Sequence, residues 1–204
     1  YTLSLTNTDP IKTDRFVKFD WPRITNPTIH FPIDETESAR LDEVEAQSLE
    51  QLRQAAEADP DSIAGVIVEP IQGEGGDNHF RDSYLRDLQR MTHEIGALFI
   101  VDEVQTGFCR TGKMFACDHW GVTPDIMTVA KGITSGYIPM GGAITRKPIS
   151  DAFVGSQKAA FRHVITFGGH PVAAAAALKN IEIMEREDLA GNAARMGGYL
   201  LDGL

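Results

Sequence analysis

Two polar residues, each at the end of an apolar run, have side chains that could do chemistry together. The first run, residues 98–101, ends at Asp102, and the second, residues 126–130, ends at Lys131. Both runs are short, continuous and rich in β-branched residues, which is typical of strands buried on both faces. Because ligands in open α/β sheets bind outside the carboxyl ends of the strands, we expect Asp102 and Lys131 on one rim of one sheet.

A lysine amine that shares a pocket with a carboxylate indicates a particular cofactor chemistry. A lysine can form a Schiff base with an aldehyde cofactor or a carbonyl substrate. The cofactor pyridoxal 5'-phosphate (PLP) also needs a partner on its pyridinium nitrogen, often an aspartate, which keeps the ring protonated and able to accept electrons. Each residue alone has a simpler explanation, since an aspartate at a strand end is commonly a helix cap or part of a surface ion pair.

The segment around these residues resembles a known enzyme family. FIVDEVQTGFCRTG (residues 99–112) and PDIMTVAKG (residues 124–132) are similar to the signature of the class III (ornithine/ω-amino acid) aminotransferases, PLP enzymes of fold type I. The resemblance implies that Lys131 forms the internal aldimine, that Asp102 pairs with the ring nitrogen, and that Gln105 lies beside the 3-oxygen of the ring. The other matching positions, in family order and spacing, are Glu103, Gly107, Arg110, Gly112, Asp125 and Gly132.

The N-terminal half narrows the resemblance. Residues 1–27 are similar to lysine 6-aminotransferases, in which an arginine just before this stretch holds the substrate α-carboxylate; the place of that arginine falls just before Tyr1, outside this sequence. From about Phe108 onward the chain is more similar to general ω-amino acid:pyruvate aminotransferases. The implied function is PLP-dependent transfer of a terminal amino group from an ω-amino donor, with L-lysine as one candidate, to a 2-oxo acid. Two alternatives remain open: a PLP aminomutase of the glutamate-1-semialdehyde type, and an inactive truncated fragment.

Two glycine-rich loops supply further candidate site residues. EPIQGEGG (residues 69–76) resembles the family loop that lines the cofactor pocket, and its second glutamate, Glu74, is implied to act in switching between the two substrates. The pattern TFGGxP begins at Thr166, whose hydroxyl is implied to bind the cofactor phosphate of the neighbouring subunit. The resemblance therefore implies a homodimer with shared active sites. On their own residues, Glu74 could be an exposed loop acid and Thr166 an ordinary helix cap.

The hydrophobic pattern predicts an α/β fold. Its order of strand, loop, helix, strand favours a mostly parallel sheet flanked by helices in three layers, an incomplete fold type I large domain. Apolar stripes at helical spacing predict helices over 36–58, 82–95, 172–187 and 189–204, with a short helix over 115–120. Strands are expected over 63–69, 97–102, 126–130 and 143–145, an extended loop over 1–34, and a flexible segment after Lys131.

The domain expectation follows from the same resemblance. Residues 1–188 would form a partial PLP-binding large domain, and residues 189–204 the start of a C-terminal small domain. Complete members of the family are roughly twice this length, so we interpret the chain as a central fragment.

Composition argues against several classes of function. The formal net charge of −10, from 19 basic and 29 acidic residues, disfavours nucleic acid as a partner. No apolar run approaches the roughly 20 residues of a membrane span, and no signal peptide is visible. Cys109 and Cys117, with His119 nearby, fit no common zinc spacing, so we expect no metal. Two reduced cysteines favour a cytoplasmic protein.

Overall fold

The computed structural model describes residues 2–6 and 9–204, which fall into two compact units. The first unit comprises residues 1–66 and 71–97, and the second comprises residues 67–70 and 98–204. In chain order the elements are α1 (Thr2–Leu5), η1 (Pro10–Lys12), α2 (Glu35–Ala58), β1 (Gly65–Val68), α3 (Asp82–Glu94), β2 (Leu98–Asp102), α4 (Cys117–Trp120), β3 (Ile126–Val129), η2 (Lys131–Thr134), β4 (Gly142–Thr145), α5 (Lys147–Asp151), α6 (Pro171–Arg186) and α7 (Leu189–Asp202).

The first unit is built on the packing of α2 against α3. Helix α2 begins after Asp34, whose side chain accepts a hydrogen bond from the Glu37 amide at 2.8 Å. Leu41 and Leu52 on its apolar stripe are buried, and its Ser48 hydroxyl lies 2.7 Å from the hydroxyl of buried Tyr84 on α3. Gly96, with a φ of 77°, follows the end of α3, where a glycine in the left-handed region commonly ends a helix. Both predicted helices are therefore confirmed. None of the helices in the described part of the chain has the length and apolar character needed to cross a bilayer.

The N-terminal segment differs from the prediction of an extended connection over residues 1–34. It contains the single turns α1 and η1, and Pro10 starts η1. The reason is that the first helical position needs no backbone N–H, so the fixed φ of proline suits it. Asp9 accepts a hydrogen bond from the Ile11 amide at 3.0 Å and so caps the turn. Residues 1, 7 and 8 of this prediction lie outside the described residues.

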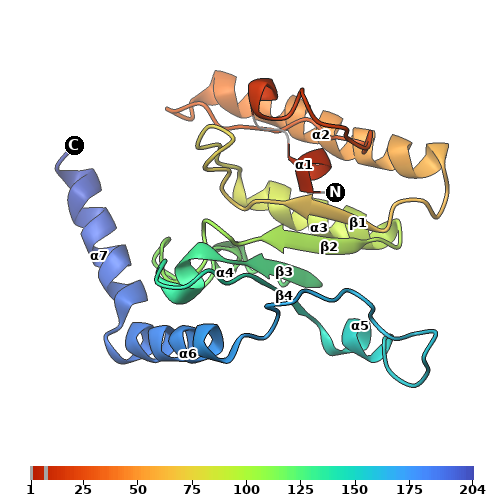
Figure 1. Cartoon of the computed structure of the whole chain (residues 1–204). Helices are drawn as coiled ribbons and strands as arrows, with labels where there is room; N and C mark the ends of the chain where they lie inside the picture. Colours follow the sequence, from red (N-terminus) through yellow and green to blue (C-terminus); the bar gives the residue numbers. More distant parts are fainter. Residues whose placement is uncertain (1, 7–8) are drawn as a thin grey trace. The chain divides into compact units, whose positions relative to one another are not determined.

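A four-stranded sheet in the order β1-β2-β3-β4 forms the frame for the second unit. The strands β2, β3 and β4 lie side by side (Figure 1), with β2 and β3 parallel and β4 antiparallel to β3. The predicted α/β fold with a mostly parallel sheet is confirmed. A buried cluster beneath the loops that follow these strands contains Phe108, Val129, Ile133, Ala177 and Met184.

The segment after Lys131, for which the sequence predicts flexibility, forms the 3-10 helix η2, and its mobility stays a prediction. Asn180 on α6 contacts this turn: its Nδ2 donates to the carbonyl oxygens of Gly132 at 2.8 Å and Ile133 at 3.1 Å. This amide binds the turn to a helix distant in sequence. The short helix α5 is likewise absent from the prediction.

Helices α6 and α7 are confirmed, with a sharp junction between them (Figure 1). Asp188 occupies the junction in the left-handed region, with a φ of 47°, and accepts a hydrogen bond from the Gly191 amide at 3.1 Å. Helix α7 belongs to the same compact unit as residues 98–188. The domain boundary expected after residue 188 stays a prediction.

Candidate active site

The parallel pairing of β2 and β3 brings Asp102 and Lys131 to the same edge of the sheet. Asp102, the last residue of β2, is in register with Thr128 on β3, and Lys131 follows three residues later. The Glu103 amide donates to the Thr128 carbonyl oxygen at 3.0 Å, so the pairing continues past the end of β2. The carboxyl ends of the two strands thus lie at the same edge of the sheet, which is required if Asp102 and Lys131 share one pocket.

Lys131 and Gln105 are in direct contact. The Lys131 Nζ donates to the Gln105 Oε1 at 3.2 Å, and the two residues come from the segments that follow β3 and β2. The amide oxygen is uncharged, so it orients the amine without an ion pair that would have to break before the amine could attack a carbonyl carbon. The structure therefore brings together two of the residues that the sequence singled out.

The backbone around Lys131 is strained. Lys131 itself has a φ of 43°, and Ser135 on the same turn has a φ of 50°. Phe108 and Cys109, in the segment that follows β2, have values of 61° and 71°. A left-handed conformation costs a residue with a Cβ about 1–2 kcal/mol, and such residues cluster at active sites, where the surrounding structure holds them in place. The strain supports a functional role for this edge of the sheet.

One glycine permits the two loops to meet. A Cβ built on Gly132 would lie 3.0 Å from the Phe108 Cβ, closer than side chains normally approach. Glycine at position 132 therefore lets the segment after Lys131 pack against the segment after β2. This contact supports the position of the lysine backbone.

The polar groups beside Asp102 fit the pyridine nitrogen side of PLP. The Asp102 Oδ1 accepts a hydrogen bond from the Val104 amide at 2.9 Å. Residues in register on neighbouring strands project to the same face of a sheet, so Thr128 shares the face of Asp102. Among the described residues the Thr128 Oγ1 is buried without a hydrogen-bond partner. A carboxylate with acceptor capacity to spare beside an unpaired hydroxyl can receive a protonated ring nitrogen.

Glu74 lies in the first unit, on the turn that its glycines form. Its carboxylate pairs with the Lys12 amine, and the two side chains are 64% and 51% exposed. This hydrogen bond is also the main cause that raises the pKa of Lys12. Glu74 is thus an exposed acid on a loop, which is the simpler of the two interpretations of this residue from the sequence.

Thr166 is exposed, in the turn that precedes α6. The capping residue of α6 is His170, with Pro171 at the start of the helix, so the simpler interpretation of Thr166 as the helix cap is wrong. The Thr166 hydroxyl therefore does not cap α6.

Glu103 is a residue whose importance the sequence analysis did not recognise. It has no exposed surface, and its carboxylate accepts hydrogen bonds from Thr106, Ala116 and Cys117. Burial, followed by the charge of Glu103, raises the pKa of the Cys117 thiol to about 12. Burial also raises the pKa of Cys109. Both thiols are therefore protonated at neutral pH and poor nucleophiles. The signals for Glu103 in the sequence are its match to the family signature and its place beside Asp102 at the end of an apolar run.

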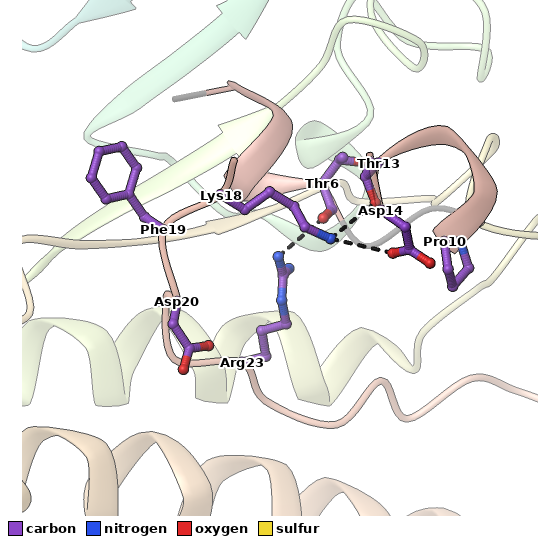
Figure 2. A pocket seen from close by; sticks show the side chains of 8 residues that line it. All are labelled: Thr6, Pro10, Thr13, Asp14, Lys18, Phe19, Asp20 and Arg23. Atoms are coloured by element: carbon purple, nitrogen blue, oxygen red, sulfur yellow. Dashed lines mark hydrogen bonds and ion pairs between the residues drawn. The ribbon is translucent and has the colours of Figure 1, made fainter. Parts of the chain in front are cut away.

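In the described part of the chain, no side-chain cluster suits a metal ion, and the cations that line one hollow already have partners. Within the described ranges, no group of three or more His, Cys, Asp or Glu side chains could hold a metal ion. A hollow of about 340 Å³ in the first unit is lined by Thr6, Pro10, Thr13, Asp14, Lys18, Phe19, Asp20 and Arg23 (Figure 2). Its two cations already have partners, since Lys18 donates to Thr13 at 3.2 Å and Arg23 donates to backbone carbonyls, including that of Thr6 at 3.0 Å. Two acids in the same lining balance their charge.

Comparison with known proteins places the chain in a family. Residues 1–204 match the family described as aminotransferase class III. All 204 residues align at 40% identity with an L-lysine-epsilon aminotransferase from Amycolatopsis lactamdurans, of which they cover 44%. The chain is 42% identical over 171 residues to a [LysW]-aminoadipate semialdehyde transaminase from Deinococcus radiodurans, which corresponds to 84% of this chain and 38% of that protein.

A solved structure supports the same conclusion. The lysine aminotransferase from M. tuberculosis, in the internal aldimine form, matches with a TM-score of 0.84 and 38% identity, over 98% of this chain and 44% of that one. The chain thus spans less than half the length of these relatives. Because one family matches at every residue from 1 to 204 and the fold agrees, this chain belongs to the class III aminotransferases.

Proposed function

We propose that the protein containing this chain catalyses PLP-dependent transfer of a terminal amino group from an ω-amino donor to a 2-oxo acid. The observation that carries the proposal is the placement of Asp102 and Lys131 at one edge of a parallel strand pair, with Gln105 on the lysine amine. L-Lysine is the donor that the similarity to L-lysine-epsilon aminotransferase favours. Because the chain spans less than half of its relatives, the activity is proposed for the whole protein.

The proposed roles follow from the chemistry of each side chain. Bound PLP would supply a ring that accepts electrons when a proton leaves the substrate carbon. Lys131 would hold the aldehyde group of the cofactor and would carry a proton at its Nζ, a general acid–base role typically worth about 10²–10⁴-fold in rate. The Asp102 carboxylate would hold the ring nitrogen in its protonated form. Gln105 orients the lysine amine and would lie on the side of the 3-oxygen of the ring.

The remaining expectations are part of the same proposal. Glu74 would take part in switching between the two substrates. Thr166 would bind the phosphate of the cofactor held by the partner subunit, and its exposed position leaves it available for that contact. A homodimer is supported by the exposed apolar side chains of the segment 154–167, namely Val154, Phe161, Val164, Ile165 and Phe167. Two free, buried cysteines suit a reducing, cytoplasmic location.

The test begins with Lys131→Ala in the purified protein, expressed with any sequence that flanks these residues in its gene. We expect the parent to show a visible absorption band when PLP is added, and the variant to lose both the band and transamination of L-lysine. Lys113→Ala is the matched control, because Lys113 is an exposed lysine in the same unit. A band that survives Lys131→Ala would rule out the assigned role.

Product analysis separates this activity from the aminomutase alternative. An aminotransferase needs an added 2-oxo acid for turnover, whereas an aminomutase converts its substrate without one. Turnover of a single substrate in the absence of any 2-oxo acid would therefore contradict the proposal. A comparison of L-lysine with other ω-amino donors assigns the donor, and sedimentation velocity measures the assembly state.

A further inference from the structure

Glu103 is a fully buried carboxylate with a complete set of hydrogen-bond donors. The Cys117 amide donates to its Oε1 at 2.7 Å, while the Ala116 amide at 3.0 Å and the Thr106 hydroxyl at 2.5 Å donate to its Oε2. A buried carboxylate is stable only when its charge is compensated. Three polar N–H and O–H groups are among the partners that compensate it, and the Cys117 side chain also hydrogen-bonds to it.

These bonds close the loop that leaves the end of β2. Glu103 stands at the beginning of the loop, and the amides of Ala116 and Cys117 stand at its end, so one side chain holds both ends together. The loop is also tight near its start. The Gly107 amide donates to the Glu103 carbonyl oxygen at 2.9 Å, and a Cβ at position 107 would lie only 2.8 Å from that oxygen. Glu103 is therefore the central connection of the loop.

The same loop carries the two side chains that contact the lysine segment. Gln105 accepts the hydrogen bond from the Lys131 Nζ at 3.2 Å, and Phe108 packs against Gly132. Neither Gln105 nor Phe108 lies on a strand or helix. Their positions therefore depend on the closure of the loop, and that closure depends on the Glu103 carboxylate.

We propose that Glu103 is a positioning residue, which acts through Gln105 to hold the Lys131 amine in place for the cofactor; the proposal rests on the proposed PLP function. The carboxylate is needed because its hydrogen-bond partners are donors. In Glu103→Gln, the nitrogen of the new side-chain amide would face a hydrogen-bond donor, so at least one of these hydrogen bonds is lost. The two ends of the loop would then shift apart. Thr106→Val is the milder change, because it removes one bond and leaves both backbone bonds in place.

A double-mutant cycle tests whether Glu103 acts through Gln105. The dissociation constant of PLP is measured for the parent, Glu103→Gln, Gln105→Ala and the double variant. We expect each single change to raise it about tenfold and the double change to raise it about tenfold as well, because coupled residues are not additive. A purely structural effect of Glu103 would multiply with that of Gln105, giving about a hundredfold. That result would overturn the inference.

A second readout uses the protein without cofactor. The rate at which an acylating reagent modifies Lys131 is measured by mass spectrometry, with Lys158, an exposed lysine outside this loop, as the internal reference. Release of the amine from Gln105 should raise this rate about threefold in Glu103→Gln and in Gln105→Ala, with no further rise in the double variant. The acylation rate of Lys131 in Thr106→Ser should equal that of the parent. In Thr106→Val the rate should rise toward that of Glu103→Gln. An unchanged Lys131 rate in both Glu103→Gln and Thr106→Val would overturn the inference.

The two readouts separate the inference from the proposed function. A parent protein that does not bind PLP would overturn the function. The acylation cycle would still decide whether Glu103 positions the Lys131 amine. A parent that binds PLP with additive variant effects would overturn the inference alone.

Discussion

The helices of the first unit and the sheet edge of the second unit use their polar side chains in opposite ways. In the first unit, arginines pair with acids: Arg53 with Glu50 and Glu57 on the same helix, and Arg81, just before α3, with Asp42 and Glu45 on α2. At the sheet edge of the second unit, Lys131 has a neutral amide as its hydrogen-bond partner, and the buried Thr128 hydroxyl has none among the described residues. Polar groups that the protein itself satisfies maintain the fold, whereas groups with capacity to spare are suited to a ligand.

The backbone shows the same contrast. Four residues with side chains adopt positive φ values in the loops that follow β2 and β3, namely Phe108, Cys109, Lys131 and Ser135. In the described part of the first unit such values occur only at Asp61 and Asp77, both in turns, where aspartate tolerates the left-handed region. Strain at bulky residues must be held by packing, and it is concentrated beside the proposed cofactor lysine.

The largest effect is expected at the sheet edge. Asp102→Asn replaces the carboxylate by a neutral amide of the same shape, so the ring nitrogen would lose the charge that keeps it protonated. We expect the rate of transamination to fall by about 10²–10⁴-fold while the absorption band of bound PLP persists. Steady-state kinetics and absorbance measure the two outcomes. Asp118→Asn, at an exposed aspartate of the same unit, is the control and should match the parent. Near-normal activity in Asp102→Asn would show that the polar groups at the sheet edge do not differ in function from those of the first unit.

A change in the core of the first unit should lower stability and leave cofactor binding unchanged. Leu88 has no exposed surface, so Leu88→Ala should lower the free energy of unfolding by about 2–5 kcal/mol, which denaturant titration measures. PLP affinity of the folded variant should stay within twofold of the parent. Leu5→Ala, at a half-exposed leucine of the same unit, should change the stability by less than about 0.5 kcal/mol. A large loss of PLP affinity in Leu88→Ala would show that the first unit also shapes the site.

Variants of the Lys12–Glu74 pair test whether Glu74 only forms a surface ion pair or also takes part in the reaction. Both side chains are more than half exposed, so as a surface pair they contribute about 0–1 kcal/mol, and Lys12→Gln should alter stability little. If Glu74 takes part in the exchange of substrates, loss of Lys12 should change the KM of the 2-oxo acid by up to about fivefold. Glu74→Gln, compared in the same assay, should change the same KM. Kinetic constants unaltered in both variants would leave Glu74 as a surface acid only.

The smallest effect is expected for acid stability. The hydrogen bond from Arg40 lowers the pKa of Glu37 from 4.5 to about 2. A lowered pKa in the folded state stabilises the fold above pH 4.5, and this contribution is lost as the pH falls toward 2. Glu37→Gln should therefore flatten the pH dependence of unfolding in that window, measured by circular dichroism. Glu43→Gln, at an exposed acid on the same helix, should keep the slope of the parent.

Much of this protein can be predicted from the sequence, because the signals are local. The apolar stripe of α2, the turn at Gly96 and the apolar runs before Asp102 and Lys131 each lie within a few residues of one another. The order of strand, helix and strand then implies parallel pairing, which puts the two strand tips on one edge. The family resemblance depends on the same contiguous residues, and the comparisons confirm it over the whole chain.

Only the tertiary structure decided which distant side chains meet. Asn180 orders the turn after Lys131 from 48 residues away, Lys12 reaches Glu74 across 62 residues, and Gln105 contacts Lys131 across 26. Whether Glu103 is solvated or buried is equally invisible to a local pattern, because burial depends on what packs above it. Periodicity is a property of neighbouring residues, whereas these contacts depend on strand register and loop closure, which exist only after folding.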